Sequence, residues 1–272
     1  MQKALTLFTL VALSVVPPIH AEDTGTDTKL HRAESAARNE IKRYARDARS
    51  LGLAPIRWDA AAWRRFAEGS AAVGALYLGD RTIYDAVQRN RTGFSNRFAK
   101  DITPFGGRRA LDVSVLLIAA GALDHDSNLR DSGRDSLESE LLAAGIVTPL
   151  LKYAFGRARP VQGEGARSFH HFDAHFASFP SGHATNAFAA ATAIAAHYDN
   201  WYVPAIAYSI AAGVAVSRVN DRAHFASDVV AGALIGRGVA KGIVWRHRLS
   251  SRGVTVLPLI TGRRVGVLFN IR

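Results

Sequence analysis

The chain has 272 residues, of which 48% are hydrophobic and 21% are charged, and this composition excludes an intrinsically disordered protein. Its length suits one sizeable hydrophobic core rather than two full domains. The formal net charge of +11 favours phosphorylated substrates, anionic lipid surfaces or nucleic acid as partners, and does not by itself separate them. No cysteine is present, which excludes disulfides and a lipoprotein anchor.

The first residues have the pattern of an export signal. Lys3 supplies a positive charge, residues 4–16 are an apolar run, and residues 17–21 end in Ala21, where we expect cleavage. The predicted division is therefore a signal peptide at 1–21, a helical domain at 22–250 and a C-terminal appendage at 251–272. Export favours the periplasm of a Gram-negative bacterium, and an uncleaved signal could instead remain as a single membrane anchor.

The rest of the chain is predicted to be helical until its last twenty residues. Asp59 is a candidate N-cap, and Asp135 with Glu138 has the spacing of a capping box. Residues 124–135 only faintly resemble a calcium loop, so we expect a polar loop there. A longer loop is expected at 161–179. The predicted helices cover about 27–50, 59–78, 81–100, 109–123, 135–155, 181–197, 202–217 and 221–246.

Alternating apolar residues at 254–260 and 265–271, separated by a turn at 261–264, predict a β-hairpin. The expected fold class is thus all-α, a helical bundle with a short C-terminal β-hairpin. The apolar stretches at 113–123, 141–151 and 184–196 are shorter than the roughly 20 residues that span a bilayer. The uncharged run at 201–217 contains Pro204. These features favour a water-soluble or peripherally membrane-bound protein.

Three short motifs carry the candidate chemistry. The third contains Arg218, His224 and Asp228, and on a helix the last two would share a face, so the carboxylate could hold one imidazole nitrogen while the other acts as a nucleophile. A histidine one turn from an acid is more often an ordinary solvated pair. Arg218 lies upstream, where its guanidinium could bind an oxyanion.

The first motif contains Lys152 and Arg159, seven residues apart and followed by Pro160. Two cations at a helix C-terminus could simply complement the helix dipole. In the second motif, Ser181 is a natural N-cap and Gly182 lets an anion approach the free N–H groups of a helix start. His183 would lie beside that anion as a proton donor. Each motif alone is a weak signal.

In order, the motifs read Lys-x6-Arg-Pro, Pro-Ser-Gly-His and Ser-Arg-x5-His-x3-Asp, and this series resembles the phosphatidic acid phosphatase type 2 superfamily over residues 152–228. The resemblance implies a helical bundle and a metal-independent phosphatase without cofactors. It implies that His224 attacks phosphorus and forms a phosphohistidine, that Asp228 orients His224, and that His183 protonates the leaving alcohol. It also implies a phosphate-binding set of five residues: Lys152, Arg159, Ser181, Gly182 and Arg218.

The substrate implied is a phosphorylated small molecule or a lipid phosphate, with peripheral membrane contact as an option and no nucleic acid. Two other functions stay open: a vanadium haloperoxidase using the same pocket, and a non-catalytic basic module that binds anionic lipids or nucleic acid. A metal site formed by His170, His171 and His175 is disfavoured, because no cysteine or well-spaced carboxylate completes it.

Overall fold

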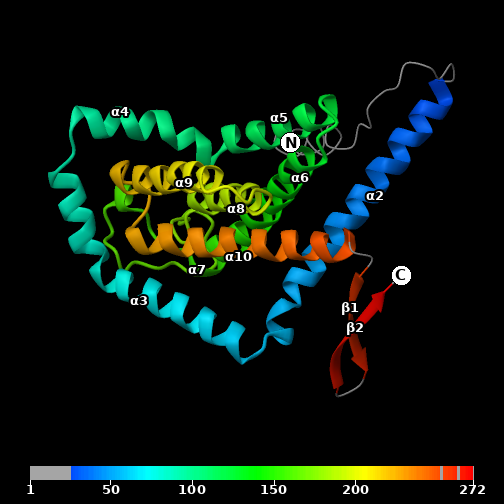
Figure 1. Ribbon diagram of the computed structural model, residues 1–272. Coiled ribbons are helices and arrows are strands. Elements are labelled where there is room, and N and C mark those ends of the chain that lie inside the picture. The colour runs from blue at the N-terminus through cyan, green and yellow to red at the C-terminus, as the bar shows by residue number, and fades with distance from the viewer. Residues whose placement is uncertain (1–25, 252–253, 262–263, 272) are drawn as a thin grey trace.

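The computed structural model describes residues 26–251, 254–261 and 264–271, and the predicted signal peptide at 1–21 lies outside them. The fold is mostly helical (Figure 1). The longer helices are α2 (Thr26–Gly52), α3 (Ala60–Arg89), α4 (Gly93–Ile102), α5 (Arg108–Leu123), α6 (Ser127–Leu142), α7 (Thr148–Phe155), α8 (Gly182–Ala196), α9 (Tyr202–Asn220) and α10 (Ala226–Ser251). Short helical turns are η1 (Ala54–Arg57), η2 (Thr103–Gly106), η3 (Ala143–Val147) and η4 (Pro160–Gln162).

Helix α8 is the centre of the bundle and packs against α6, α9 and α10 (Figure 1). Its sequence is alanine-rich, so backbones approach closely. A Cβ added to Gly236 of α10 would lie 2.2 Å from the carbonyl oxygen of Thr185, which leaves glycine as the residue that fits this crossing. One core cluster contains Ala187 and Ala191 of α8 with Ala211 and Val214 of α9. Small core residues therefore set the short distance between the central helices.

Several predicted helix boundaries are confirmed and others are wrong. Asp59 caps α3 by accepting a hydrogen bond from the amide of Ala62 at 2.7 Å. Helix α3 continues to Arg89, through the break predicted between 78 and 81. The next break comes at Thr92, which caps α4 in a capping box with Ser95. Asp80, which falls in the predicted break, is instead a buried charged residue inside α3.

The predicted capping box of Asp135 and Glu138 is also wrong. Helix α6 begins eight residues earlier, at Ser127, because Asp126 accepts hydrogen bonds from the amides of Asn128 and Leu129. Most of the expected polar loop at 124–135 is therefore helical. Asp135 and Glu138 lie buried inside α6. The predicted end near residue 155 is correct, and α6 reaches α7 through the π-helical turn η3.

A second buried acid of α6 is held by hydroxyl groups. Glu140 accepts hydrogen bonds from Ser114 of α5 at 2.6 Å and from Ser136 at 3.0 Å. Complete burial raises the pKa of Glu140 to about 8. The hydrogen bonds from Ser114 and Ser136 lower this pKa, but they offset only part of the effect of burial. The carboxyl group is consequently neutral over much of the physiological pH range.

Helix α9 begins at the second residue of the predicted apolar run at 201–217 and continues through the rest of the run without interruption. Pro204 lies in its first turn, where a missing N–H costs no helical hydrogen bond. Among the described residues, α9 alone is long and apolar enough to cross a membrane by length and composition, and 22% of its apolar window is buried. A core helix of a soluble protein can pass the same test, so this finding does not establish a membrane span.

Two strands follow α10. They are β1 (Val254–Thr261) and β2 (Arg264–Ile271), and they pair antiparallel with Val254 opposite Ile271. Residues 262–263 of the predicted turn lie outside the described residues. The separation of the chain into a helical domain and an independent C-terminal appendage stays a prediction.

Candidate active site

The first motif leaves α7 through a sharp turn. Gly156 has φ +56°, and a Cβ there would lie 1.6 Å from the carbonyl oxygen of His170, so both the backbone angle and the space require glycine. Lys152 is in the last turn of α7, whereas Arg159 lies beyond the helix in extended backbone. Only Lys152 therefore lies at a helix C-terminus, and the expectation that Arg159 lies there too is wrong. The turn brings them together instead.

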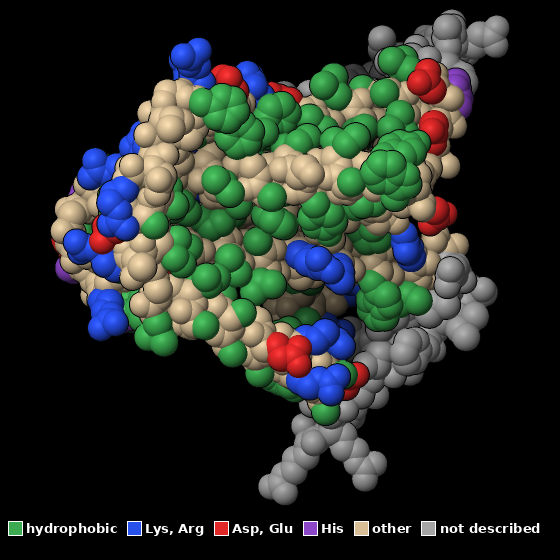
Figure 2. Space-filling view, turned by 60° about the vertical axis from the view of Figure 1, so that its left-hand side comes forward, with side chains coloured by type: hydrophobic (Ala, Val, Ile, Leu, Met, Phe, Trp, Pro, Cys, Tyr) green, Lys and Arg blue, Asp and Glu red, His purple; other side chains and the backbone are tan. Residues whose placement is uncertain are grey.

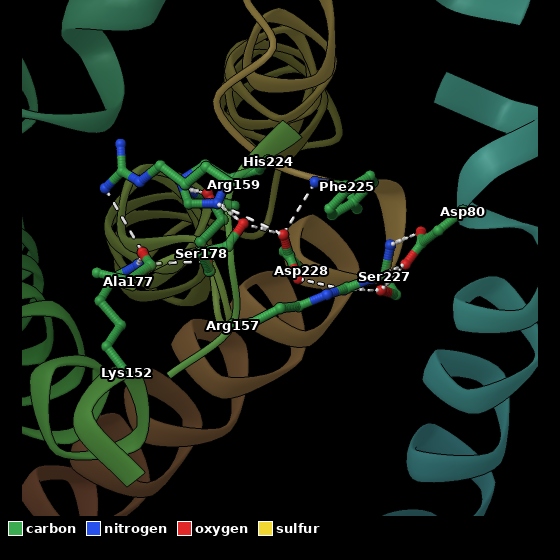
Figure 3. A network of polar contacts seen from close by, with 12 residues as sticks. Asp80, Lys152, Arg157, Arg159, Ala177, Ser178, His224, Phe225, Ser227 and Asp228 are labelled. Atoms are coloured by element: carbon green, nitrogen blue, oxygen red, sulfur yellow. Dashed lines mark hydrogen bonds and ion pairs between the residues drawn. The ribbon is translucent and has the colours of Figure 1, made fainter. Parts of the chain in front are cut away.

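Lys152 and Arg159 meet at one carbonyl group. The Lys152 ammonium donates to the oxygen of Ala177 at 2.5 Å, and the Arg159 guanidinium donates to the same oxygen at 3.5 Å (Figure 3). Among the described residues, no carboxylate forms an ion pair with either side chain. Burial, followed by the charge of Arg159, lowers the pKa of Lys152 to about 7. Two half-buried cations beside one another are thus short of negative charge.

The second motif forms the start of α8, as predicted. Ser181 is the N-cap and accepts from the amide of Ala184 at 3.5 Å. A Cβ on Gly182 would lie 3.8 Å from the Lys152 side chain, so this helix start adjoins the cation pair. His183 packs on the η2 loop, where a Cβ on Gly107 would lie 3.6 Å from its Nε2. The N–H groups of α8 and the first motif therefore face one region.

The third motif is a turn rather than the predicted helix from 221. Residues 221–225 precede α10, and the amides of Ala223 and His224 both donate to the carbonyl oxygen of Arg218. Another link joins the motifs, because the amide of Val161 donates to the carbonyl oxygen of Arg222. The turn brings His224 near Asp228 without placing both on one helix.

His224 and Asp228 are buried, and the nearest nitrogen–oxygen distance is 3.7 Å, too long for a hydrogen bond. Ser178 lies between them. Its hydroxyl donates to Asp228 Oδ2 at 2.6 Å and is 3.5 Å from His224 Nδ1. Asp228 Oδ2 also accepts from the amide of Phe225 at 2.9 Å. None of the described residues hydrogen-bonds to His224 Nε2, which leaves that nitrogen available as a nucleophile.

Arg218 approaches the same region from the end of α9. Its Nη1 donates to Thr103 and to Asp221, both at 3.1 Å. Its Nε is buried and has no hydrogen-bond partner among the described residues. A buried guanidinium nitrogen without an acceptor is costly, and a bound oxyanion would satisfy it.

Both histidines are held neutral. Burial and then the charges of Arg218, Lys152 and Arg159 lower the pKa of His183 to about 4. Burial lowers the pKa of His224 to about 4 as well, although Asp228 acts in the opposite direction. A neutral His224 suits a nucleophile. His183 can hold a proton only after an anion offsets the neighbouring cations.

A buried charge network behind Asp228 was missed from the sequence. Arg157 is fully buried and donates to Asp228 Oδ1 at 2.6 Å, to Asp80 Oδ2 at 2.7 Å and to Ser227 Oγ at 2.8 Å (Figure 3). Its guanidinium lies 4.4 Å from the ring centroid of Phe225. Asp80 comes from α3 and also accepts from the amide of Ser227. Arg157 lies within the first motif, and an arginine at that position could have suggested a role in the site. The sequence around Asp80 contains no pattern that indicates such a role.

The segment 161–179 is largely without regular structure, as expected, apart from η4. His170 hydrogen-bonds with Glu164 at 2.7 Å and stacks on Phe176, and His171 Nδ1 lies 3.1 Å from the carbonyl oxygen of Ala154. His175 is exposed. The three histidines thus have separate surroundings.

Known proteins are similar to the part of the chain that holds the three motifs. The family model described as PAP2 superfamily matches residues 138–252. A lipid A 1-phosphatase of Rhizobium johnstonii is 42% identical over 132 residues, which are 47% of this chain and 47% of that protein. A lipid A 1-phosphatase of Rhizobium etli is 40% identical over 104 residues, 37% of this chain and 44% of that protein. The match spans less than half of each relative.

A crystal structure described as the first transmembrane PAP2 type phosphatidylglycerolphosphate phosphatase, from Bacillus subtilis, is also similar. It has a TM-score of 0.53 and 25% sequence identity, and the match covers 68% of this chain and 94% of that one. All three motifs lie within the residues matched by the family model.

Proposed function

Starting from residues 138–252 as a PAP2 superfamily region, we propose that the protein is a phosphatase that hydrolyses phosphate monoesters through a phosphohistidine on His224. The observation that carries this proposal is the unpaired positive charge of Lys152 and Arg159 beside the neutral His224. A half-buried cation pair without a carboxylate partner needs an anion. A phosphate group supplies that charge, and its phosphorus would then face the nucleophile.

The residues suggest the following steps. His224 Nε2 attacks phosphorus while the bond from phosphorus to the alcohol oxygen breaks, and His183 gives its proton to that oxygen. Lys152, Arg159, Arg218 and the N–H groups at the start of α8 hold the phosphate oxygens. Water then attacks phosphorus and gives a proton to His183, the bond from phosphorus to nitrogen breaks, and phosphate leaves.

The phosphate itself would set the protonation state of His183. In the free site, nearby cations disfavour the imidazolium form. A dianionic phosphate monoester would offset Lys152, Arg159 and Arg218 and raise the pKa of His183. Substrate binding therefore favours the protonated form of His183, the general acid. Asp228 acts on His224 through Ser178 and stabilises the positive charge that develops on the imidazole.

A lipid phosphate of the cell envelope is the proposed substrate class. The similarity to lipid A 1-phosphatases supports a lipid substrate. The surface gives separate support: Trp201, which directly precedes α9, is 81% exposed, Ile206 of α9 is 59% exposed and Leu116 of α5 is 66% exposed. Figure 2 shows hydrophobic side chains spread over one face, with Lys and Arg along its left-hand edge and beside a hollow in its lower part, and Asp and Glu along its right-hand edge. Such a face suits contact with an anionic membrane, and the export signal suits the periplasm.

The test is phosphate release without added metal from an aryl phosphate and from a lipid phosphate in anionic vesicles. We expect release from the lipid and, with a 32P-labelled substrate, capture of 32P on the protein after a denaturing quench at alkaline pH, because a phosphohistidine is labile in acid and survives in alkali. His224→Ala should lose both turnover and labelling while its circular dichroism spectrum is unchanged. His175→Ala, on the exposed loop, is the matched control. Substantial turnover by His224→Ala would refute the covalent mechanism.

A further inference from the structure

A second cluster of ionisable side chains lies at the other end of α10 from His224. It combines Asp47 of α2, Glu138 of α6 and His247 of α10, and Figure 1 shows α2 crossing this end of α10. Twenty-one residues of helix separate Ala226 from His247, about 30 Å at the helical rise. The cluster therefore has no part in the proposed hydrolysis.

The three side chains offer ligand atoms at the spacing of a metal site. His247 Nε2 is 3.2 Å from Asp47 Oδ2 and 3.6 Å from Glu138 Oε2, and all three ligand atoms lie within 4.8 Å of one another. Ligands about 2.0 to 2.1 Å from a tetrahedral zinc ion lie about 3.4 Å apart. The separations of His247 Nε2 from the two carboxylate oxygens fall on either side of that value.

Glu138 shows that this cluster is short of hydrogen-bond donors. Its side chain is 0% exposed, and neither carboxylate oxygen accepts a hydrogen bond within the described parts of the chain. Arg43 is the neighbouring cation, with Nη2 3.2 Å from Glu138 Oε2 and 2.8 Å from Glu40 Oε2. A buried carboxylate without hydrogen bonds is expensive. Arg43 is 22% exposed and can remain with Glu40 when another cation takes its place at Glu138.

Residues around the cluster already orient the ligands. Asp135 Oδ1 is 2.5 Å from His247 Nδ1, which directs the other ring nitrogen, Nε2, toward the two carboxylates. Arg246 donates to Asp47 Oδ1 at 2.6 Å, which leaves Oδ2 for the cluster. At metal sites, a ligand histidine commonly hydrogen-bonds to a carboxylate through its other ring nitrogen. A ligand carboxylate commonly accepts a hydrogen bond from a further donor.

From this geometry we propose that Asp47, Glu138 and His247 bind one divalent cation. One nitrogen and two carboxylate oxygens suit zinc better than magnesium, which prefers oxygen ligands throughout. Since the ligands come from three helices far apart in the sequence, the cation fastens α2 to α6 and α10. Its role is to hold α2 on the bundle.

The experiment uses the full-length protein, stripped with a chelator and dialysed against dilute zinc. We expect one equivalent of zinc per chain by elemental analysis, beyond any held by the exposed loop histidines. A variant with His170, His171 and His175 all changed to Gln removes that loop binding. Cobalt should give the visible absorption of a tetrahedral site. At a zinc concentration about 100 times the Kd, the unfolding midpoint should rise by about 5 to 10 °C.

Asp47→Asn and Glu138→Gln should each abolish the retained zinc and the rise in the unfolding midpoint. Asp47 lies on the peripheral α2, so its variant remains informative if Glu138→Gln fails to fold. His197→Gln is the matched control, since His197 touches Asp135 but not the cluster. A loop variant that retains no zinc would overturn the proposal, leaving an ion-paired cluster without metal. So would zinc retention that is unchanged by Asp47→Asn.

Discussion

Replacement of Asp80 by Asn tests whether the buried network behind Asp228 holds the catalytic geometry. Asp80 is 0% exposed and receives hydrogen bonds from Arg157 at 2.7 Å and from the hydroxyl and amide of Ser227 at 2.5 and 2.9 Å. Asn keeps an oxygen for the Ser227 amide. Its NH2 group, however, would face the Arg157 and Ser227 donors, so one buried charge pair is broken.

The magnitude follows from burial. Breaking a buried ion pair by removing one partner costs about 3 to 5 kcal/mol, because the remaining charge stays uncompensated. Arg157 also donates to Asp228 at 2.6 Å, so its displacement would loosen the carboxylate that acts on His224. Residues that orient a reacting group in this way commonly change rates by about 10-fold to 100-fold. We expect kcat to fall by at least about 10-fold.

The assay combines urea unfolding with phosphate release at a temperature where the variant is folded. Asp85→Asn is the matched control, on the same helix but in an exposed pair with Arg81 at 3.0 Å. That pair should contribute about 0 to 1 kcal/mol. If Asp80→Asn lost no more stability than Asp85→Asn and kept its kcat, the network would have no positioning role.

Two further predictions concern pH. Because burial lowers the pKa of Lys152 to about 7, the unbound site loses this cation as pH rises, so kcat/KM should fall above about pH 7. Lys152→Arg, which stays charged, should move that fall to higher pH in a rate profile, and an unmoved fall would exclude Lys152 as its cause. The folded-state pKa of Glu140 is about 8 against a reference of 4.5, so the unfolded state releases its proton first and stability declines between these values. Glu140→Gln should remove about 3 to 4 kcal/mol of that decline between urea unfolding at pH 5 and at pH 8; an equal decline in both proteins would contradict the assignment.

Local signals in the sequence were sufficient for parts of the fold and site. Asp59 and Ser181 were recognised as caps because an N-cap needs only its own side chain and the next three amides. Asp135 was misassigned for the converse reason. It has the residue type and spacing of a cap, but its carboxylate pairs with His197 and His247, which come from distant helices. A cap and a buried ion pair use the same residue type, so local pattern does not distinguish them.

The sequence by itself determined the helical class, the loop at 161–179 and the three motifs, because periodicity and residue spacing are properties of short segments. Tertiary structure decided how the motifs meet. Gly156 turns the chain so that Arg159 joins Lys152 at Ala177, and Ser178 rather than a direct hydrogen bond connects Asp228 with His224. It also decided the role of Asp80, which reaches Arg157 across 77 residues. Such contacts depend on the packing of α3 against α10, and no short segment encodes that packing.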